Sequence, residues 1–399
     1  MFLFKNKLDS NLKYCMDNKL YKKYRVNILC KTLMESTEKK IKSYKGTILR
    51  SIPSVKLICA ILTPSGIERL TELPQVEHIS QDSYAFLCGS SVLSANGVSL
   101  KGRHHLTGKG IGIAVIDSGV YPHPDLLKPT NKIKKFMDLI NDYKYPYDDN
   151  GHGTFMSGII CGSGHTSKGM YVGAAENSGI YMVKAFNSLG RAYISDILYG
   201  LEMIYADAQE YNIRVVCLPF ELIEHNPFTI KLFSKSFESL TTSGIIPVVP
   251  SGSLGNGDCS IRGIAAIDSC ITVGGLETTG STAAPYIHSS AGPFGNAEKP
   301  NFAAACVDIC SLNTNVKYIS ERNGIKLFAA NLERPYVVYT GTSCAAAYIS
   351  AVCAILLENN KDLSYKDICS LLKASSTMIE ASKTIQGAGS IDLQKLLPQ

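Results

Sequence analysis

Three short segments of the sequence contain side chains that together could perform nucleophilic catalysis. Asp117 follows a short apolar run, His152 stands between two glycines, and Ser343 follows a Gly-Thr pair and precedes a long apolar run. A serine hydroxyl is a weak nucleophile until a base removes its proton, histidine is the base that works near neutral pH, and a carboxylate can fix the imidazole tautomer. We therefore predict that Ser343 is the nucleophile, His152 the general base and Asp117 the residue that orients His152.

Each of the three segments also has a purely structural explanation. An aspartate after a strand is often a turn or capping residue, a Gly-His-Gly segment is compatible with an ordinary turn, and a serine before an apolar helix is often only its N-cap. The combination favours catalysis, because a nucleophile, a base and an orienting carboxylate are all present. A helix that starts at Ser343 would also supply free N–H groups for an oxyanion.

Short apolar runs that alternate with helical patterns are expected to position these residues. Strands are predicted at 111–116, 180–184, 215–218, 245–249 and 269–274, and helices at 194–210, 231–242 and after Ser343. Near-continuous apolar strands with helical crossovers are typical of a parallel sheet that is covered on both faces. The predicted fold class is therefore α/β, with the candidate site at the carboxyl ends of the strands.

The chain before residue 106 has a different organisation. A small β-α-β unit is predicted from a strand at 54–62, a helix at 64–73 and a strand at 76–80. The segment that follows is rich in Ser, Asn, Gly and His, which is typical of a linker. The predicted divisions are a basic N-terminal extension at 1–44, the small domain at 45–88, a linker at 89–105 and the main domain at 106–399.

The composition narrows the class of protein. The 399 residues are 45% hydrophobic, which is enough for a large core, and the net charge of +6 is too dispersed to indicate a nucleic-acid partner. The apolar run 348–357 is about half the length of a membrane span, and lysines interrupt the apolar residues at the N-terminus before they resemble a secretory signal. The 13 cysteines read as reduced thiols, so we expect a soluble, cytoplasmic protein with no membrane partner.

The segments around the three candidate residues resemble those of the subtilisin-like serine proteases, the peptidase S8 family. The similar segments are IAVIDSGVYPHPDL, DDNGHGT and GTSCAAA, in the family's order Asp, His, Ser. The resemblance covers roughly residues 106–397 and is closest to the bacterial intracellular subtilisins. It implies a seven-stranded, mostly parallel sheet flanked by helices, and a serine endopeptidase that hydrolyses peptide or protein substrates.

Residues 45–82 resemble the inhibitory propeptide of the same family. This resemblance implies a zymogen whose small β-α-β domain acts as an intramolecular inhibitor of the main domain. Self-processing would then cut the chain between Asp82 and His105 and release the inhibitor.

The predicted oxyanion hole departs from the family pattern. Where the family has an asparagine that donates to the oxyanion, this chain has Ser253, and the other expected donors are the backbone N–H of Ser343 and the hydroxyl of Thr342. A serine hydroxyl is also a donor, but it is shorter than an asparagine amide. Loss of such a donor in subtilisin lowers turnover by about 10²–10³.

The residues that should line the substrate cleft also differ from the family. The family has Ser-Leu-Gly-Gly on one rim, which pairs with an extended peptide by strand addition, whereas this chain has Pro219, Phe220, Glu221 and Leu222. The predicted substrate-binding residues are Gly190, Arg191, Ala192, Leu218, Pro219, Phe220, Glu221 and Gly252. Arg191 and Glu221 could pair across the cleft and narrow it, or they could select a charged substrate.

These departures leave a second function open. The chain could be a catalytically weak or inactive relative that binds a peptide or regulates a partner. An intact set of Asp117, His152 and Ser343 favours the peptidase over this alternative.

No cofactor is predicted. Calcium is common in the family, but Asp125, Asp142, Asp148 and Asp149 do not form a recognisable calcium loop. The pair Cys306 and Cys310 has no matching second pair, so we predict no metal site.

Overall fold

A ten-stranded, mostly parallel sheet forms the centre of the protein. A computed structural model describes residues 7–87, 94–96, 105–222, 224–280, 282–295 and 297–397. Seven neighbouring strands run parallel: β15 (Phe302–Ala305), β13 (Ile271–Glu277), β12 (Ile246–Pro250), β10 (Ile213–Cys217), β6 (Gly112–Asp117), β8 (Gly179–Lys184) and β7 (Ile133–Asp138). The prediction of a seven-stranded parallel core is confirmed. The short strands β20 (Ser376–Thr377), β21 (Ser390–Ile391) and β14 (Ala284–Pro285) complete the sheet.

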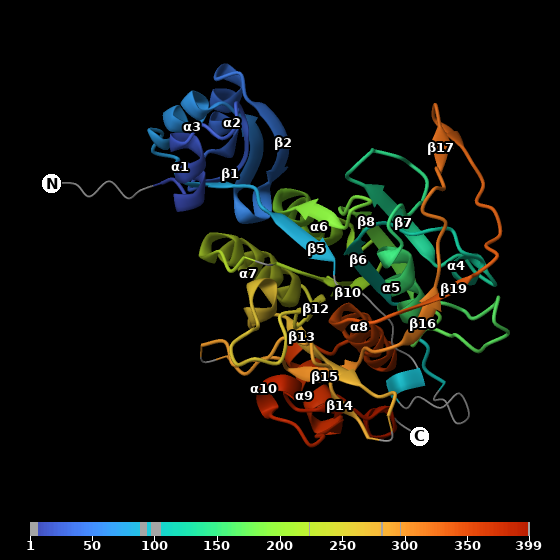
Figure 1. Cartoon of the computed structure of the whole chain (residues 1–399). Helices are drawn as coiled ribbons and strands as arrows, with labels where there is room; N and C mark the ends of the chain where they lie inside the picture. Colours follow the sequence, from blue (N-terminus) through green and yellow to red (C-terminus); the bar gives the residue numbers. More distant parts are fainter. Residues whose placement is uncertain are drawn as a thin grey trace.

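The strands of this sheet are apolar because both of its faces are covered. The helices α5 (His152–Cys161) and α8 (Thr342–Asn359) pack on one face, and α6 (Ile194–Asp207) and α7 (Pro227–Thr242) pack on the other. Figure 1 shows the two layers of helices around the sheet. Every residue of β6 is buried, so the strand that carries Asp117 is fixed on both sides.

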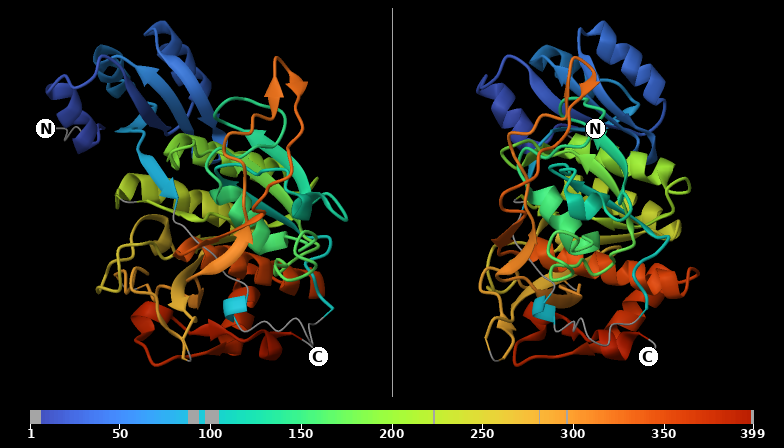
Figure 2. Two further views of the ribbon diagram at one scale, coloured as in Figure 1. Left: turned by 45° about the vertical axis from the view of Figure 1, so that its right-hand side comes forward. Right: turned by 90° about the vertical axis from the view of Figure 1, so that its right-hand side faces the viewer.

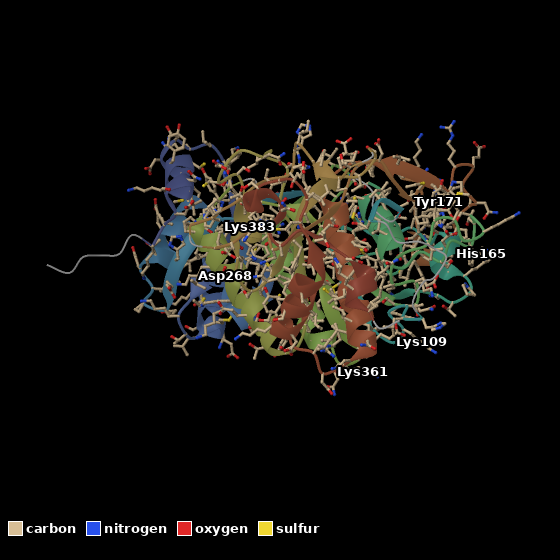
Figure 3. All side chains as sticks on the ribbon, turned by 90° about the horizontal axis from the view of Figure 1, so that it is seen from below. Lys109, His165, Tyr171, Asp268, Lys361 and Lys383 are labelled. Carbon is tan, nitrogen blue, oxygen red and sulfur yellow. The ribbon has the colours of Figure 1, made fainter. Side chains whose placement is uncertain are left out.

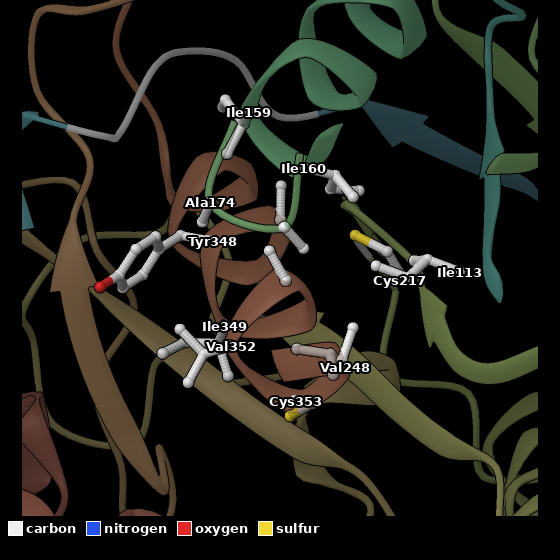
Figure 4. Packing of buried hydrophobic residues seen from close by; sticks show 14 of the residues in the cluster. Ile113, Ile159, Ile160, Ala174, Cys217, Val248, Tyr348, Ile349, Val352 and Cys353 are labelled. Carbon is white, nitrogen blue, oxygen red and sulfur yellow. The ribbon is translucent and has the colours of Figure 1, made fainter. Parts of the chain in front are cut away.

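The helix α8 is the core of one layer. It is apolar on nearly all sides, which is typical of a helix surrounded by protein, and Figure 4 shows Tyr348, Ile349 and Val352 of α8 packed among residues from α5 and the sheet. Among the described residues it is the one helix with the length and hydropathy of a membrane span, and 89% of that stretch is buried within the protein. Charged side chains such as Lys109, at the periphery, surround this core (Figure 3).

The N-terminal domain is a separate, antiparallel four-stranded sheet in the order β2-β3-β1-β4. Its elements are α1 (Ser10–Asp17), β1 (Tyr24–Cys30), α2 (Met34–Ser43), β2 (Thr47–Ile52), β3 (Leu57–Leu62), α3 (Pro64–Thr71) and β4 (Val76–Gln81). The predicted boundary at residue 45 differs from the structure, because β1 lies between β3 and β4 in the middle of the sheet. The sequence did not predict β1 because the polar residues Arg25 and Asn27 interrupt its apolar pattern.

The two domains contact each other along one face of the main sheet. The β2 side of the N-terminal domain packs on α6, and the turn after β2 packs on α7. Figure 2 shows this stacking from two sides, with the N-terminal domain at one end of the molecule. A single strand, β5 (Tyr84–Leu87), leaves the N-terminal domain and enters the main domain.

Shorter elements complete the main domain. They are β9 (Arg191–Tyr193), β11 (Phe220–Glu221), α4 (Pro124–Leu127), β16 (Ile309–Leu312), β17 (Glu321–Arg322), β18 (Ile325–Lys326), β19 (Tyr336–Tyr339), α9 (Tyr365–Ser375), α10 (Lys383–Gln386) and α11 (Leu393–Leu396). The strands β7 and β15 had no clear signal in the sequence. Lysines interrupt the apolar pattern of β7, and β15 is mostly alanine, which has a low preference for strands.

Candidate active site

Asp117 and His152 form a buried, hydrogen-bonded pair. Asp117 is the last residue of β6, and His152 is the first residue of α5. The Nδ1 atom of His152 lies 2.8 Å and 3.0 Å from the two carboxylate oxygens of Asp117. Asp117 is fully buried and His152 is 2% exposed. A carboxylate in this position holds the proton on Nδ1 and leaves Nε2 as the basic atom.

The turn before His152 is held by a second buried carboxylate. Asp148 Oδ1 accepts from the hydroxyl of Ser118 at 2.9 Å and from the N–H of Gly151 at 2.7 Å, while Oδ2 accepts from the N–H of Thr154 at 2.9 Å and from its hydroxyl at 2.6 Å. Asp148 therefore links the residue after Asp117 to the first turn of the helix that carries His152. Fixing both ends of the pair in this way keeps the imidazole aligned.

For the peptidase reaction predicted from the sequence, replacing Asp148 with asparagine should lower kcat by about 100-fold and leave KM nearly unchanged, because a misplacement of about 1 Å in a catalytic group costs on this order. The amide nitrogen would face either the donors of Ser118 and Gly151 or the two donors of Thr154, so His152 would move. The measurement is steady-state cleavage of one peptide by the Asp148→Asn chain. Asp142→Asn, in an exposed part of the same connection, is the control, and an unchanged kcat in Asp148→Asn would contradict the positioning role.

A buried lysine supports the same region from the neighbouring strand. Lys184, at the end of β8, is opposite Asp117 in the parallel register and is fully buried. Its Nζ atom donates to the carbonyl of Ser118 at 2.6 Å and to Asp149 at 2.5 Å. The ion pair compensates for the burial of the lysine charge, and the bond to Ser118 fixes the chain immediately after Asp117.

Ser343 lies at the start of α8, as predicted. Its hydroxyl donates to the carbonyl of Pro219 at 2.8 Å, and the side chain is fully buried. The neighbouring Thr342, predicted as an oxyanion donor, donates its hydroxyl to the carbonyl of Gly252 at 3.2 Å. A hydroxyl has one proton to donate, so both groups must reorient before they act on a substrate.

Ser253 and Glu221 are brought together at the end of β12. One carboxylate oxygen of Glu221 accepts from the N–H of Ser253 at 2.8 Å, and the other accepts a short hydrogen bond from its hydroxyl. Gly252 has a φ of 108°, a backbone conformation that favours glycine at this turn. The side chain of Ser253, which was predicted to donate to the oxyanion, is thus hydrogen-bonded to Glu221.

The strand β5 fills the predicted substrate cleft. It is the middle strand of a three-stranded antiparallel sheet in the order β11-β5-β9, with Phe86 opposite Glu221 on one side and opposite Arg191 on the other. The two rims therefore do not pair with each other across an open cleft. Arg191 and Glu221 were expected either to pair across the cleft or to select a charged substrate. In the structure, the Glu221 carboxylate accepts a hydrogen bond from Ser253.

The remaining predicted cleft residues lie beside this three-stranded sheet. Gly190 precedes β9 with a positive φ of 69°, and Ala192 is opposite Ala85 of β5. Leu218 and Phe220 are fully buried and pack into the hydrophobic core under the sheet. These two residues therefore support the rim rather than present side chains to a substrate.

A buried polar cluster joins the N-terminal domain to α6, just before β5 begins. Asp82 accepts from Arg25 Nε at 2.7 Å, from Asn27 Nδ2 at 3.0 Å and from the N–H of Ser195 at 3.0 Å. Ser195 is the second residue of α6, so Asp82 caps that helix from another domain and complements its dipole. Arg25 also donates to Asp196 at 2.9 Å.

Burial raises the pKa of the Asp196 carboxyl, an effect that Arg25 partly offsets. We refer to the side chains of Arg25, Asn27, Asp82, Ser195 and Asp196 as the junction cluster.

Three of the four aspartates considered for calcium have hydrogen-bond or ion-pair partners within the protein. Asp125 accepts from the hydroxyls of Thr166 at 2.5 Å and Tyr336 at 2.6 Å, and Asp148 and Asp149 have the partners described above. Within the described ranges, no group of three or more His, Cys, Asp or Glu side chains is arranged to hold a metal ion.

Sequence reasoning missed three features of the site. The supporting role of Lys184 had one signal in the sequence, because a charged residue stands at the end of an apolar strand. The junction cluster had a weaker one, since Arg25 and Asn27 interrupt an otherwise apolar run. The contact between Glu221 and Ser253 had none, because these residues are 32 positions apart and lie on different strand ends.

Comparison with known proteins agrees with this geometry. Residues 108–389 match the Subtilase family (Peptidase_S8). Serine protease AprX of Bacillus subtilis (strain 168) is 29% identical over 356 residues, which are 85% of this chain and 78% of the relative. An alkaline protease of Alkalihalobacillus alcalophilus is 25% identical over 350 residues, which are 87% of this chain and 80% of the relative.

A solved structure shows the same fold. Fervidolysin from Fervidobacterium pennivorans, a keratinolytic enzyme related to subtilisin, superposes with a TM-score of 0.74 at 18% sequence identity, over 94% of this chain and 61% of the fervidolysin chain. The family match spans more than half of the chain, and the predicted subtilisin-like resemblance is confirmed. The protein therefore belongs to the subtilase family of serine peptidases.

Proposed function

We propose that the protein is a serine endopeptidase that uses Asp117, His152 and Ser343 as its catalytic triad and is made as a self-processing zymogen. The observation that carries the proposal is the 2.8 Å contact between His152 Nδ1 and Asp117. The helix α5, which begins at His152, packs against α8, which begins with Thr342 and Ser343. The family supports peptide hydrolysis in general, and this geometry supports the assignment of roles.

The reaction proceeds by acyl transfer. The hydroxyl of Ser343 leaves the Pro219 carbonyl and attacks the peptide carbonyl, while His152 Nε2 takes its proton. The imidazolium, stabilised by Asp117, then gives this proton to the leaving amine as the C–N bond breaks. Water, activated by the same histidine, hydrolyses the acyl-enzyme and restores the serine. The steps need only side chains and water, and we propose no bound cofactor.

The N-terminal domain is proposed to be the intramolecular inhibitor. Support comes from β5, which occupies the place of an extended substrate between the two cleft rims, and from the junction cluster, which holds the domain against α6. The chain that follows β5 lies largely outside the described residues, and it includes most of the proposed processing region between Asp82 and His105. A cut in this region would free the end of β5 but leave the junction cluster intact.

Action in the cytoplasm remains a proposal. It is supported by the 12 described cysteines, all of which are free thiols, since oxidising compartments favour disulfides.

A serine-directed fluorophosphonate tests the proposal. Ser343 is fully buried in the full-length form, so labelling should appear only as the N-terminal domain is released, and the modified peptide should contain Ser343. His152→Ala should abolish the labelling because the hydroxyl would lose its base. Released, folded protein that fails to react would contradict the triad and favour the alternative of a silent relative that only binds peptides.

A further inference from the structure

Glu221 carries a charge that the proposed reaction does not use. Its carboxylate accepts two hydrogen bonds from Ser253, which are neutral donors. Among the described residues, no lysine, arginine or histidine forms a salt bridge with it. A carboxylate close to the nucleophile that has no cationic partner within the described part of the chain can bind a positively charged group.

The register of β5 shows which residue of a substrate would meet this carboxylate. Leu87 is opposite Phe220 and Phe86 is opposite Glu221. A peptide that took the place of β5 and continued past the Leu87 position would next come opposite Pro219, whose carbonyl holds the hydroxyl of Ser343. That next residue is therefore the one whose carbonyl Ser343 attacks.

The side chain of the attacked residue lies on the same face as Glu221. In an extended peptide, side chains two positions apart point to the same side and are separated by about 6.5–7 Å. The attacked residue is two positions beyond the one that lies directly opposite Glu221. The side chain of lysine or arginine is long enough to reach back over this distance, and shorter side chains are not.

The position directly opposite Glu221 is a poor place for a cation. The same residue of β5, Phe86, is also opposite Arg191 on β9. Because directly opposite residues share a face, a lysine or arginine there would meet the guanidinium of Arg191 as well as the carboxylate, and like charges across strands are unfavourable. This argument leaves the attacked residue as the site of selection.

Pairing of a substrate cation with Glu221 would also affect the oxyanion. A carboxylate close to the attacked carbonyl repels the negative charge that develops there, and it occupies the Ser253 hydroxyl that could stabilise that charge. A substrate cation bound to Glu221 would neutralise the first effect and release the hydroxyl. Binding of the correct side chain would thus complete the oxyanion hole.

We propose that Glu221 selects lysine or arginine at the residue before the cleaved bond, and that the bound cation frees Ser253 to donate to the oxyanion. This inference rests on the proposed peptidase function, since it names the substrate class of the same site. It makes Glu221 a specificity-determining residue that also controls turnover.

The test compares two peptides that are identical except for arginine or citrulline at the attacked residue. Citrulline has the same shape without the charge. The full chain should cleave the arginine peptide with a kcat/KM about 10-fold higher, as expected for a partly exposed charge-assisted pair, and part of the difference should appear in kcat. Since β5 competes equally with both peptides, their ratio does not depend on how much inhibitor remains bound.

Two variants complete the design. Glu221→Gln should reduce the ratio towards one and raise kcat on the citrulline peptide, because the repelling charge is gone. Glu224→Gln, an exposed glutamate three positions later, should keep the wild-type ratio. Circular dichroism would verify that both variants are folded.

The outcomes separate this inference from the proposed function. Equal rates on the two peptides by the wild-type chain, or an unchanged ratio in Glu221→Gln, would overturn the role of Glu221 and leave the peptidase intact. Failure of the wild-type chain to cleave any peptide, together with no phosphonate labelling, would overturn both. The comparison within the wild-type chain stands even if Glu221→Gln fails to fold.

Discussion

A Ser343→Ala chain is expected to remain intact at 43.3 kDa, whereas the unchanged chain should divide into two fragments. The larger fragment should begin between Asp82 and His105, and the smaller should contain the N-terminal domain. In subtilisin, removal of the nucleophile lowers kcat by about 10⁶, so no processing should be visible during an ordinary incubation. Mass spectrometry of the two purified proteins measures this difference directly.

The matched control is Ser350→Ala, a buried serine on the same helix. Its hydroxyl donates to the carbonyl of Ala346 at 2.8 Å, within α8, so its loss removes a local hydrogen bond and leaves the site in place. Ser350→Ala should process normally. Division of the Ser343→Ala chain at the same bond in highly purified protein would show that another group, or another protease, makes the cut.

The second large effect is expected at the junction cluster. Replacing Asp82 with alanine removes the partner of Arg25 and the external cap of α6 at the same time. Across the interface, Asp82 accepts hydrogen bonds from the N–H and the hydroxyl of Ser195. A hydrogen bond to a charged acceptor contributes about 1.5–3 kcal/mol, which corresponds to a roughly 10–150-fold weaker hold on the main domain. The processed Asp82→Ala protein should therefore show peptidase activity at concentrations where the wild-type protein is still inhibited by its N-terminal fragment.

An exposed ion pair across the same interface provides the control. Glu77 and Lys231 are 3.5 Å apart, with side chains 40% and 57% exposed. Exposed pairs contribute at most about 1 kcal/mol, so Glu77→Gln should change inhibition by only a few-fold. Equal effects of Asp82→Ala and Glu77→Gln would mean that the interface is held by its apolar contacts and that the junction cluster is not its main support.

The parts of the fold that could be predicted are those governed by local pattern. The run from Ile113 to Ile116 is continuously apolar because β6 is buried on both faces. The position of Asp117 at the strand end followed directly. The helix after Ser343 was equally clear, since α8 is apolar on all sides.

The parts that could not be predicted depend on contacts between distant segments. The strand β1 contains Arg25 and Asn27, whose polarity has a purpose only when Asp82 and α6 are beside them. The same holds for Glu221, whose partner Ser253 comes from another strand end. In each case a polar residue interrupts the local sequence pattern because it forms a contact with a distant element. The local pattern alone does not reveal such a contact.

The position of β5 has a consequence for how activity would depend on dilution. While β5 belongs to the same chain as the cleft, its effective concentration there is in the millimolar range expected for a tethered ligand, and dilution does not change its occupancy. Once the tether is cut, the same strand becomes a separate molecule whose occupancy falls as the protein is diluted. The specific activity of the cleaved protein would therefore rise on dilution. A dilute solution would be active, whereas a concentrated stock would remain largely inhibited.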